Sequence, residues 1–518
     1  MPTRKTTKKS AAAKSRKQAA PVAMSVDAAS TIIRAAKPAA IRLKKVSAKP
    51  VGFKLLKTPK RVERPARIHP RRFPHRVVEG EESEIFSRTA PLALRERRDV
   101  RAAPRAATDE IALVRDTELT EPGRTKTASN VGEPSVAING DAVLYTGNWY
   151  AAMSDDGGAS FRFMNPTEFD DQQFQFCCDQ VAHYIPSIDT FVWLLQYGPD
   201  TGDNIQRLAF AKTPDALAGH WRLFDITTQM LGVRGAFLDF PDLATGANAL
   251  YVTTNIFLGN GGGSAVVRIP FAGIESGQIS AQRFVSQQFS LRVAQNCGTT
   301  AFFATTDETT SALRVFSWTE AATQPTSQAV PITRWIGGNG YQSRTPDGRR
   351  WLDRADPRIT GATLAGEHLW FAWSVDRGSN QRPKPFIQIA KIRISDMTTV
   401  ENINVFDNDS ATAYPALSTN SNDEVGISYM IGGGPRFPSH VVGVLTGTVR
   451  SSIVAASTRG PQFSPDGKGE WGDYLTVRRV FPNQKLFAAT GFTLKGPGPG
   501  NNQDATPRFV IFGRSGDL

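Results

Sequence analysis

The sequence predicts an all-β protein built as a β-propeller, with seven blades preferred and six as the alternative, and with a disordered basic N-terminal tail. Three observations favour this fold. The charge changes sharply near residue 78, short strand-like runs dominate from about residue 126, and a loose strand–turn–strand phrase recurs seven times. The 518-residue chain has room for several domains, but a repeat architecture can take up most of it as one body.

The first segment, residues 1–78, is expected to be the disordered tail. It holds 22 Lys and Arg against 2 Asp and Glu, whereas residues 79–518 hold 39 against 46. Stretches such as MPTRKTTKKS contain too few large apolar side chains to offset the entropy of ordering. Clustered cations bind polyanions such as nucleic acid or acidic lipid by releasing counterions, which makes the tail a candidate tether. A tail that only aids solubility is the alternative.

The second segment, residues 79–125, is expected to be a linker. The stretch ALRERRDVRAA near residue 94 can form a short charged helix. The stretch DEIALVRDTEL, just before the first phrase, can pair with the final RFVIFGR. Such a pairing would close the ring, because a propeller needs a strand from one terminus to complete a blade built by the other.

The third segment, residues 126–518, is expected to be the propeller. Runs rich in Val, Ile, Phe, Tyr, Trp and Thr alternate here with Gly, Asn, Asp and Pro clusters, and helical periodicity is almost absent. Each phrase would supply the two inner strands of a blade, and the residues that follow it would supply the two outer strands. The phrases are GEPSVAINGDAVLYTGN, CCDQVAHYIPSIDTFVWLLQY, DFPDLATGANALYVTTN, LRVAQNCGTTAFFATTD, ADPRITGATLAGEHLWFAWS, AYPALSTNSNDEVGISYM and WGDYLTVRRVFPNQKLFAATGF.

A compact cluster, SDDGGASF, lies near residue 154. Ser154, Asp156, Gly158 and Phe161 fit the pattern Ser-x-Asp-x-Gly-x-x-aromatic. An Asp side chain can bond the amides of its own turn, glycine accepts positive φ, and the aromatic ring can pack between sheets. The pattern resembles the Asp-box, or BNR repeat, of the sialidase superfamily. The resemblance implies a structural hairpin between the outer strands of a blade, on the face away from the active site.

The resemblance also implies a glycan-directed chemistry. Sialidases hold a carboxylate with three arginines and use a Tyr–Glu nucleophile pair and an Asp acid/base, and an Arg-Ile-Pro motif precedes their boxes. Here Arg268, Ile269 and Pro270 spell that motif, but they follow the box and fall on an outer strand of the third blade. The order differs from the family's, so the arginine role is not carried over to Arg268.

The starts of the repeated phrases provide the candidate site. Inner strands begin at the face where central cavities of propellers open, so polar residues there should converge. Two carboxyl groups with separated pKa values can cleave a glycosidic bond, arginines can bind an acidic sugar, and aromatic rings can stack on sugars. Acids that cap strand starts are the alternative. The catalytic candidates are Asp179, Asp239, Asp356 and Asp473, and the substrate-binding candidates are Arg292, Arg358, Tyr414 and Tyr474, with Glu133 and Asp242 nearby.

The three cysteines are too few for a disulfide framework. Adjacent Cys177 and Cys178 can close a strained disulfide beside Asp179, but two buried thiols are favoured in a reducing compartment, and Cys297 is expected in the core.

No zinc, calcium-loop or phosphate-cradle pattern occurs, so neither metal nor cofactor is predicted. The chain shows no secretory signal or membrane span, which indicates a cytoplasmic location by default, with non-classical export as the alternative. A monomer is expected.

Two functions follow as hypotheses. The first is a sialidase-like propeller that binds, and by paired carboxylates hydrolyses, a glycan in its central cavity. The second is a non-catalytic propeller that binds a glycan or protein at the same face and is tethered by its basic tail. The fold alone cannot choose between them.

Overall fold

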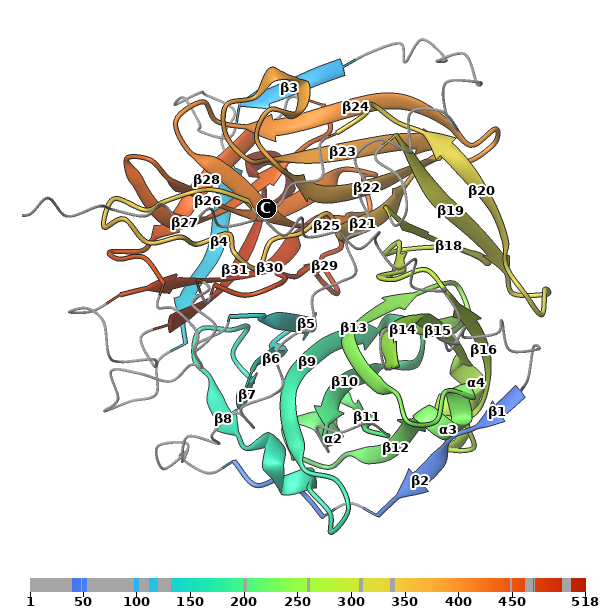
Figure 1. Cartoon of the computed structure of the whole chain (residues 1–518). Coiled ribbons are helices and arrows are strands. Elements are labelled where there is room, and N and C mark those ends of the chain that lie inside the picture. Colours follow the sequence, from blue (N-terminus) through green and yellow to red (C-terminus); the bar gives the residue numbers. More distant parts are fainter. Residues whose placement is uncertain are drawn as a thin grey trace, which may run out of the picture.

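The computed structural model describes residues 40–47, 49–53, 97–101, 111–119, 132–148, 150–198, 203–258, 261–306, 311–335, 341–447, 450–461, 469, 471–495 and 505–518. Within these residues the chain forms seven antiparallel sheets of four strands, three of which gain a fifth strand at the outer edge. In Figure 1 the colours follow the sheets around a ring, from teal through green, yellow and orange to red. The prediction of a seven-bladed propeller is confirmed.

Each blade begins with the strand nearest the axis and continues outward. The first three blades are β5 (Ser135–Asn139), β6 (Ala142–Gly147), β7 (Tyr150–Ser154) and β8 (Arg162–Met164); β9 (Phe176–Ile185), β10 (Thr190–Tyr197), β11 (Ile205–Lys212) and β12 (Arg222–Thr227); and β13 (Phe237–Thr245), β14 (Ala249–Leu258), β15 (Gly261–Pro270) and β16 (Ser280–Ser286). The next three are β17 (Arg292–Val293), β18 (Thr300–Thr305), β19 (Ala312–Thr319) and β20 (Thr326–Pro331); β21 (Ile359–Ala365), β22 (His368–Val375), β23 (Phe386–Arg393) and β24 (Thr398–Phe406); and β25 (Ala411–Thr419), β26 (Val425–Gly433), β27 (Arg436–Val444) and β28 (Arg450–Ala456).

The seventh blade is built from both ends of the chain. Its inner strands are β29 (Val477–Arg479), β30 (Phe487–Leu494) and β31 (Ala505–Arg514), and its outer strand is β4 (Ile111–Glu118). The two antiparallel partners β31 and β4 pair from Arg508 with Glu118 to Arg514 with Ile111, and Figure 1 shows the blue β4 beside the red β31. This is the closing pair that the sequence predicts. Arg508 also forms ion pairs with Asp116 and Glu118.

The inner strands close the ring. Each of them contacts the inner strand of the next blade, and β29 of the last blade contacts β5 of the first. The hydrophobic clusters lie between neighbouring blades; one of them joins Leu144 and Met153 of the first blade to Trp193 and Leu195 of the second. Strands with both faces covered read as near-continuous apolar runs, such as HLWFAWSV in β22.

Two short pieces of the expected tail are strands. β1 (Ala40–Arg42) pairs with β16 and β2 (Lys44–Val46) pairs with β12, each at the outer edge of a blade. Ile41 and Leu43 are buried there. An edge strand offers unpaired backbone groups, and alternating apolar side chains let this segment use them. The rest of the tail lies outside the described residues, apart from residues 47 and 49–53.

The expected helix near residue 94 is instead a strand where the structure describes it. β3 (Arg97–Arg101) pairs in parallel with β24 of the fifth blade. A charged helix of this length is marginal alone, whereas the open edge of β24 provides hydrogen-bond partners. The helical segments in the described residues are short; they are η1 (Pro166–Phe169), η2 (Pro186–Ile188), α2 (Thr213–Leu217), α3 (Thr228–Leu231), α4 (Phe271–Ser276), η3 (Ser379–Gln381) and η4 (Ser515–Asp517). None of the helices described is long and apolar enough to cross a membrane.

Candidate functional site

The candidate site lies around the central channel. We call the face where the inner strands begin the start face, and the opposite face, where each inner strand turns into the second strand, the turn face. The predicted residues lie near the starts of the inner strands; some precede the strand or begin it, and Asp179, Asp239 and Tyr414 lie within its first four residues. Three residues near these starts, Glu133, Phe240 and Tyr414, have left-handed φ values of 71°, 53° and 59°. Such strain at non-glycine residues persists only where surrounding structure imposes it, and it is frequent at functional sites.

Irregular pairing accompanies two of these residues. The register between β13 and β14 shifts between Asp239 and Asp242, which brackets Phe240. The register between β25 and β26 shifts between Ala413 and Ala416, which brackets Tyr414. A bulge bends the strand and changes the direction of a side chain, so these shifts alter what the inner strands present to the channel.

An acidic group with one buried arginine occupies the start face. Arg358 Nε lies 2.6 Å from Asp356 Oδ2, and Arg358 Nη2 lies 3.5 Å from Asp473 Oδ1. The guanidinium carbon of Arg358 also lies 4.2 Å from the centre of the Phe240 ring. All three charged side chains are nearly buried. Charges from the fifth and seventh blades are thus held together away from bulk water, where their interactions are strong.

Asp239 adds a second type of carboxyl group to the start face. Its Oδ1 accepts a 3.0 Å hydrogen bond from Gln196 Nε2 of the second blade. Desolvation raises the pKa of Asp239 above its usual value, and the charge of Asp473 raises it further, against the opposing effects of Gln196 and Arg358. The pKa of Asp239 therefore lies above the ordinary value, whereas Asp473 is paired with a cation. The structure brings these two predicted residues into electrostatic contact.

The two predicted tyrosines line the same region but are buried. Tyr414 packs edge-on against Trp351 with 6.2 Å between ring centres, and its backbone N–H donates to Ser374 Oγ at 3.1 Å. Tyr474 packs edge-on against Phe240 at 5.9 Å, and its hydroxyl lies 3.5 Å from the backbone oxygen of Gln180. The structure therefore leaves no ring face of either tyrosine open for the expected stacking on a sugar.

Their hydroxyl groups lie among charges. Burial raises the pKa of Tyr414 well above its usual value, and Asp473 is the next largest cause. Burial likewise raises the pKa of Tyr474, followed by the charge of Asp179. Both phenols therefore stay protonated near neutral pH, so they can donate hydrogen bonds but are poor nucleophiles.

Arg292 lies apart from the start-face group. Its Nε is 3.0 Å from Asp242 Oδ2, and Nη2 of Arg478 is 3.9 Å from Asp242 Oδ1. We call Asp242, Arg292 and Arg478 the mid-channel group; all three are buried. Burial lowers the pKa of Arg478 to about 10, so it remains cationic at neutral pH. Arg292 and Arg358, the two predicted sugar-binding arginines, are each already paired with an aspartate.

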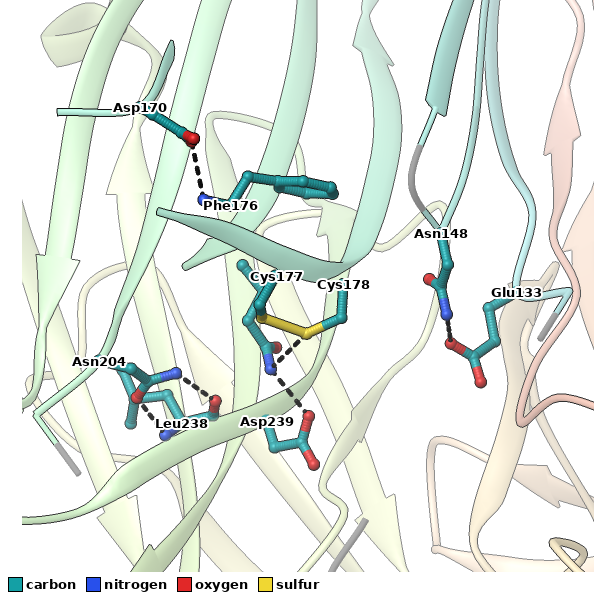
Figure 2. The surroundings of a disulfide bond; sticks show 10 residues. Glu133, Asn148, Asp170, Phe176, Cys177, Cys178, Asn204, Leu238 and Asp239 are labelled. Atoms are coloured by element: carbon teal, nitrogen blue, oxygen red, sulfur yellow. Dashed lines mark hydrogen bonds between the residues drawn. A yellow bond between two sulfur atoms is a disulfide. The ribbon is translucent and has the colours of Figure 1, made fainter. Parts of the chain in front are cut away.

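Glu133 and Asp179 complete the ring of start-face acids. Glu133 Oε2 accepts a 2.6 Å hydrogen bond from Asn148, as Figure 2 shows. Asp179 is buried and directly follows Cys177 and Cys178, which form a disulfide. This differs from the favoured expectation of two thiols. Gln196 Nε2 lies 3.5 Å from Cys178 Sγ and also donates to Asp239, so one amide links the disulfide to this carboxyl group. Figure 2 shows the disulfide beside Asp239.

The SDDGGASF cluster joins β7 and β8, the outer strands of the first blade. Ser154 Oγ accepts the Gly158 N–H at 2.9 Å, and Asp156 Oδ1 accepts the Ser160 N–H at 2.9 Å. Phe161 packs edge-on against Phe509 of the last blade, with 5.8 Å between ring centres. These contacts fasten a hairpin, and none of them reaches the channel. Arg268 lies on β15, the third strand of its blade, and its guanidinium covers Trp318.

Several channel residues were not predicted, namely Arg478, Phe240 and Gln196. Arg478 lies five positions after Asp473 in the same phrase, further along the direction of the inner strand. Following each inner strand beyond its first residue would have found it, because alternate side chains of a strand point to one face. No group of three or more His, Cys, Asp or Glu side chains suited to a metal ion occurs in the described part of the chain.

Comparisons with known proteins give distant structural likenesses. No family model and no curated protein matches the sequence. An α-L-arabinofuranosidase, Arb93A from Fusarium graminearum, is 10% identical with a TM-score of 0.38, covering 77% of this chain and 97% of that one. A protein of unknown function from Dyadobacter fermentans is 10% identical with a TM-score of 0.38, covering 78% and 99%.

A NanB sialidase mutant from Streptococcus pneumoniae is 8% identical with a TM-score of 0.35, covering 76% of this chain and 70% of that one. Likenesses this weak assign neither family nor activity. The function of this chain must be inferred from the side chains around its own channel.

Proposed function

We propose that the start face of the channel binds a carbohydrate and hydrolyses a glycosidic bond. The observation that carries the proposal is the unequal environment of two neighbouring carboxyl groups. Asp239 is desolvated and its pKa is raised, while Asp473 is paired with the guanidinium of Arg358. Glycoside hydrolysis requires this division, with one acid to protonate the leaving group and one carboxylate to act as base or nucleophile.

The roles follow from these two environments. Asp239 would donate its proton to the glycosidic oxygen as the bond to the anomeric carbon breaks. Asp473 would attack that carbon or take a proton from an attacking water molecule. Arg358 would orient Asp473 through the contact at 3.5 Å, and Gln196 would orient Asp239 through the bond at 3.0 Å. The protonated hydroxyl of Tyr414 would donate a hydrogen bond to the substrate or to Asp473.

The charge of the start face favours a neutral glycan. The acids at this face outnumber the arginine that forms ion pairs with them in the described structure, Arg358, and that arginine is already held by Asp356 and Asp473. The carboxylates of this face would repel an acidic sugar, and this repulsion would weaken its binding relative to a neutral sugar. The acids of the described start face are Glu133, Asp179, Asp239, Asp356 and Asp473. We therefore propose a neutral oligosaccharide as substrate rather than a sialoside.

The alternative function is a binding propeller without catalysis, held at a polyanion by its basic segment. The exposed side chains of Arg42, Lys44 and Lys45 on the edge strands β1 and β2 favour it. This reading predicts heparin or DNA binding that weakens steeply with salt, and that decreases when these three residues are changed to alanine.

A glycan array and a chromogenic-glycoside screen of the full chain test the proposal. They are repeated with Asp239→Asn, Asp473→Asn and Asp179→Asn. We expect binding by all four proteins. Turnover of every substrate should be lost in Asp473→Asn, whereas Asp239→Asn should lose turnover of glycosides whose leaving group is unactivated. Binding without turnover by the wild type would favour the alternative. If the wild type neither binds nor cleaves any sugar, the glycan function is wrong.

A further inference from the structure

The opposite end of the channel contains a cavity of about 300 Å³. Its walls are the ends of the inner strands and the turns that follow them, so it opens at the turn face. Its charged lining residues are Arg478 and Arg479, and no carboxylate lines it within the described part of the chain. The two ends of the channel therefore differ in sign, with acids at the start face and arginines at the turn face.

Arg478 carries positive charge that its neighbours only partly neutralise. In the mid-channel group two guanidinium groups share one carboxylate, and Asp242 lies nearer to Arg292, at 3.0 Å, than to Arg478, at 3.9 Å. Arg478 Nε and Nη2 lie 3.4 and 3.3 Å from the backbone oxygen of Ala182. Arg478 Nη1 makes no hydrogen bond to any described residue, although the side chain is only 8% exposed. A buried cation with an unused donor favours an anionic ligand.

Arg479 provides a second cation that is already fixed in place. Its Nε donates to the backbone oxygen of Thr419 at 2.8 Å, and its Nη2 donates to that of Asn420 at 3.1 Å. These bonds hold the guanidinium at the cavity wall. They use Nε and Nη2, so Nη1 is available to a ligand. A donor that is fixed before the ligand arrives costs less entropy on binding.

The remaining walls are suited to the body of an organic ligand. Phe271, Tyr184 and Phe481 contribute aromatic surface, and the amide side chains of Gln295 and Asn296 are adjacent. The volume of about 300 Å³ lies at the lower end of the range for small-molecule sites and exceeds what a bare ion needs.

We propose that the turn-face cavity binds a small organic oxyanion, with its carboxylate or phosphate at Arg478 and Arg479 and a ring-sized body against the aromatic walls. The inference goes beyond the proposed function, because it concerns the opposite end of the channel and uses none of the start-face acids. The two can fail separately.

Calorimetric titration of the full chain at low salt tests this site. The probes are glucuronate and glucose 6-phosphate, with glucose as the neutral control and inorganic phosphate as the control without a ring. We expect at least one sugar anion to bind about tenfold or more tightly than glucose, because charge-assisted bonds to arginine are strong. Inorganic phosphate should bind more weakly than glucose 6-phosphate if the aromatic walls contribute.

Variants locate the binding. Arg479→Gln should weaken it about tenfold by removing one cation. Gln484→Glu places a carboxylate at the exposed cavity rim without removing a packed group and should also weaken it, whereas Gln328→Glu on the outer strand β20 should not. Asp473→Asn should leave it unchanged. Equal affinity for glucose and both sugar anions, or equal effects of Gln484→Glu and Gln328→Glu, would overturn the proposal.

Discussion

Arg358 and Asp473 form an ion pair at the start face of the channel, with 3.5 Å between Nη2 and Oδ1. They belong to the fifth and seventh blades, and the inner strand of the sixth blade, β25, lies between those two blades in the ring. Closure of the ring is therefore what brings these charges together. The same arginine also holds Asp356 at 2.6 Å, so one cation serves two carboxylates.

Replacing Arg358 should destabilise the fold strongly. Arg358→Ala leaves Asp356 and Asp473 buried without their cation, and breaking a buried pair in this way costs about 3 to 5 kcal/mol. Urea denaturation at pH 7 measures the loss. The control is Asp155→Asn, which removes the exposed pair with Arg162 and should cost at most about 1 kcal/mol. Similar losses in the two variants would contradict the burial of the Arg358 group.

The raised pKa of Asp239 should appear in the pH dependence of stability. Because the folded chain binds this proton more tightly than the unfolded chain, stability falls as pH rises from the usual value of 3.8 through the folded pKa. Asp239→Asn lacks this loss. The unfolding free energy of the variant minus that of the wild type should therefore rise across this window and then level off.

Asp156→Asn provides a control of opposite sign. Although desolvation acts to raise it, hydrogen bonds from Ser160 and Ser154 lower the pKa of Asp156 to about 2. Its ionised form stabilises the fold, and that stabilisation is lost as pH falls from 3.8 towards 2. The free energy of this variant relative to the wild type should thus decrease as pH rises through the same interval. A flat difference for Asp239→Asn would show that its carboxyl is not desolvated.

Gly158 should be intolerant of a side chain. It has a φ of 80°, and a Cβ atom there would lie 2.1 Å from the ring of Phe509. Gly158→Ala should cost about 2 to 4 kcal/mol through backbone strain and overpacking. Gly140 also has positive φ, at 58°, but open space around it, so Gly140→Ala should cost only about 1 kcal/mol. Thermal unfolding of the two variants compares them, and equal shifts in Tm would contradict this account of the hairpin.

The closing strand should decide whether a shortened chain folds. Residues 105–518 keep β4, whereas residues 126–518 lose it and leave the edge of β31 unpaired. Both fragments lack β1, β2 and β3, so their difference isolates β4. We expect a cooperative transition by circular dichroism for the longer fragment, and a much lower Tm or aggregation for the shorter one. Indistinguishable transitions would show that β4 is dispensable.

Much of the fold could be predicted from local patterns. Alternating apolar runs and turn residues identified the phrases that became the inner strand pairs, and the run IALVRDTE identified the closing strand. The pieces β1, β2 and β3 could not be predicted, because their strands form only against edges that the completed blades provide. Local composition there indicates a tail or a helix, and the tertiary partner overrides it.

The site was predictable in part. Inner-strand starts indicated which acids approach the axis, but not which acid pairs with which arginine, because pairing depends on bulges at Phe240 and Tyr414 that change side-chain direction. The burial of Tyr414 and Tyr474 depends on packing against residues from other blades. The turn-face cavity was not predicted from the sequence. It is lined by the ends of the inner strands, whereas the candidate residues were taken from the strand starts.

The central claim is that Asp239 acts as an acid and Asp473 as a carboxylate in glycoside cleavage. It is tested most directly by turnover of two glycosides of one sugar, one with a dinitrophenyl leaving group and one with an unactivated alcohol. We predict that Asp239→Asn retains cleavage of the first, which needs no protonation, and loses about 100-fold or more on the second, while Asp473→Asn loses both. Equal losses on both substrates for Asp239→Asn, or no cleavage of either by the wild type, would contradict the claim.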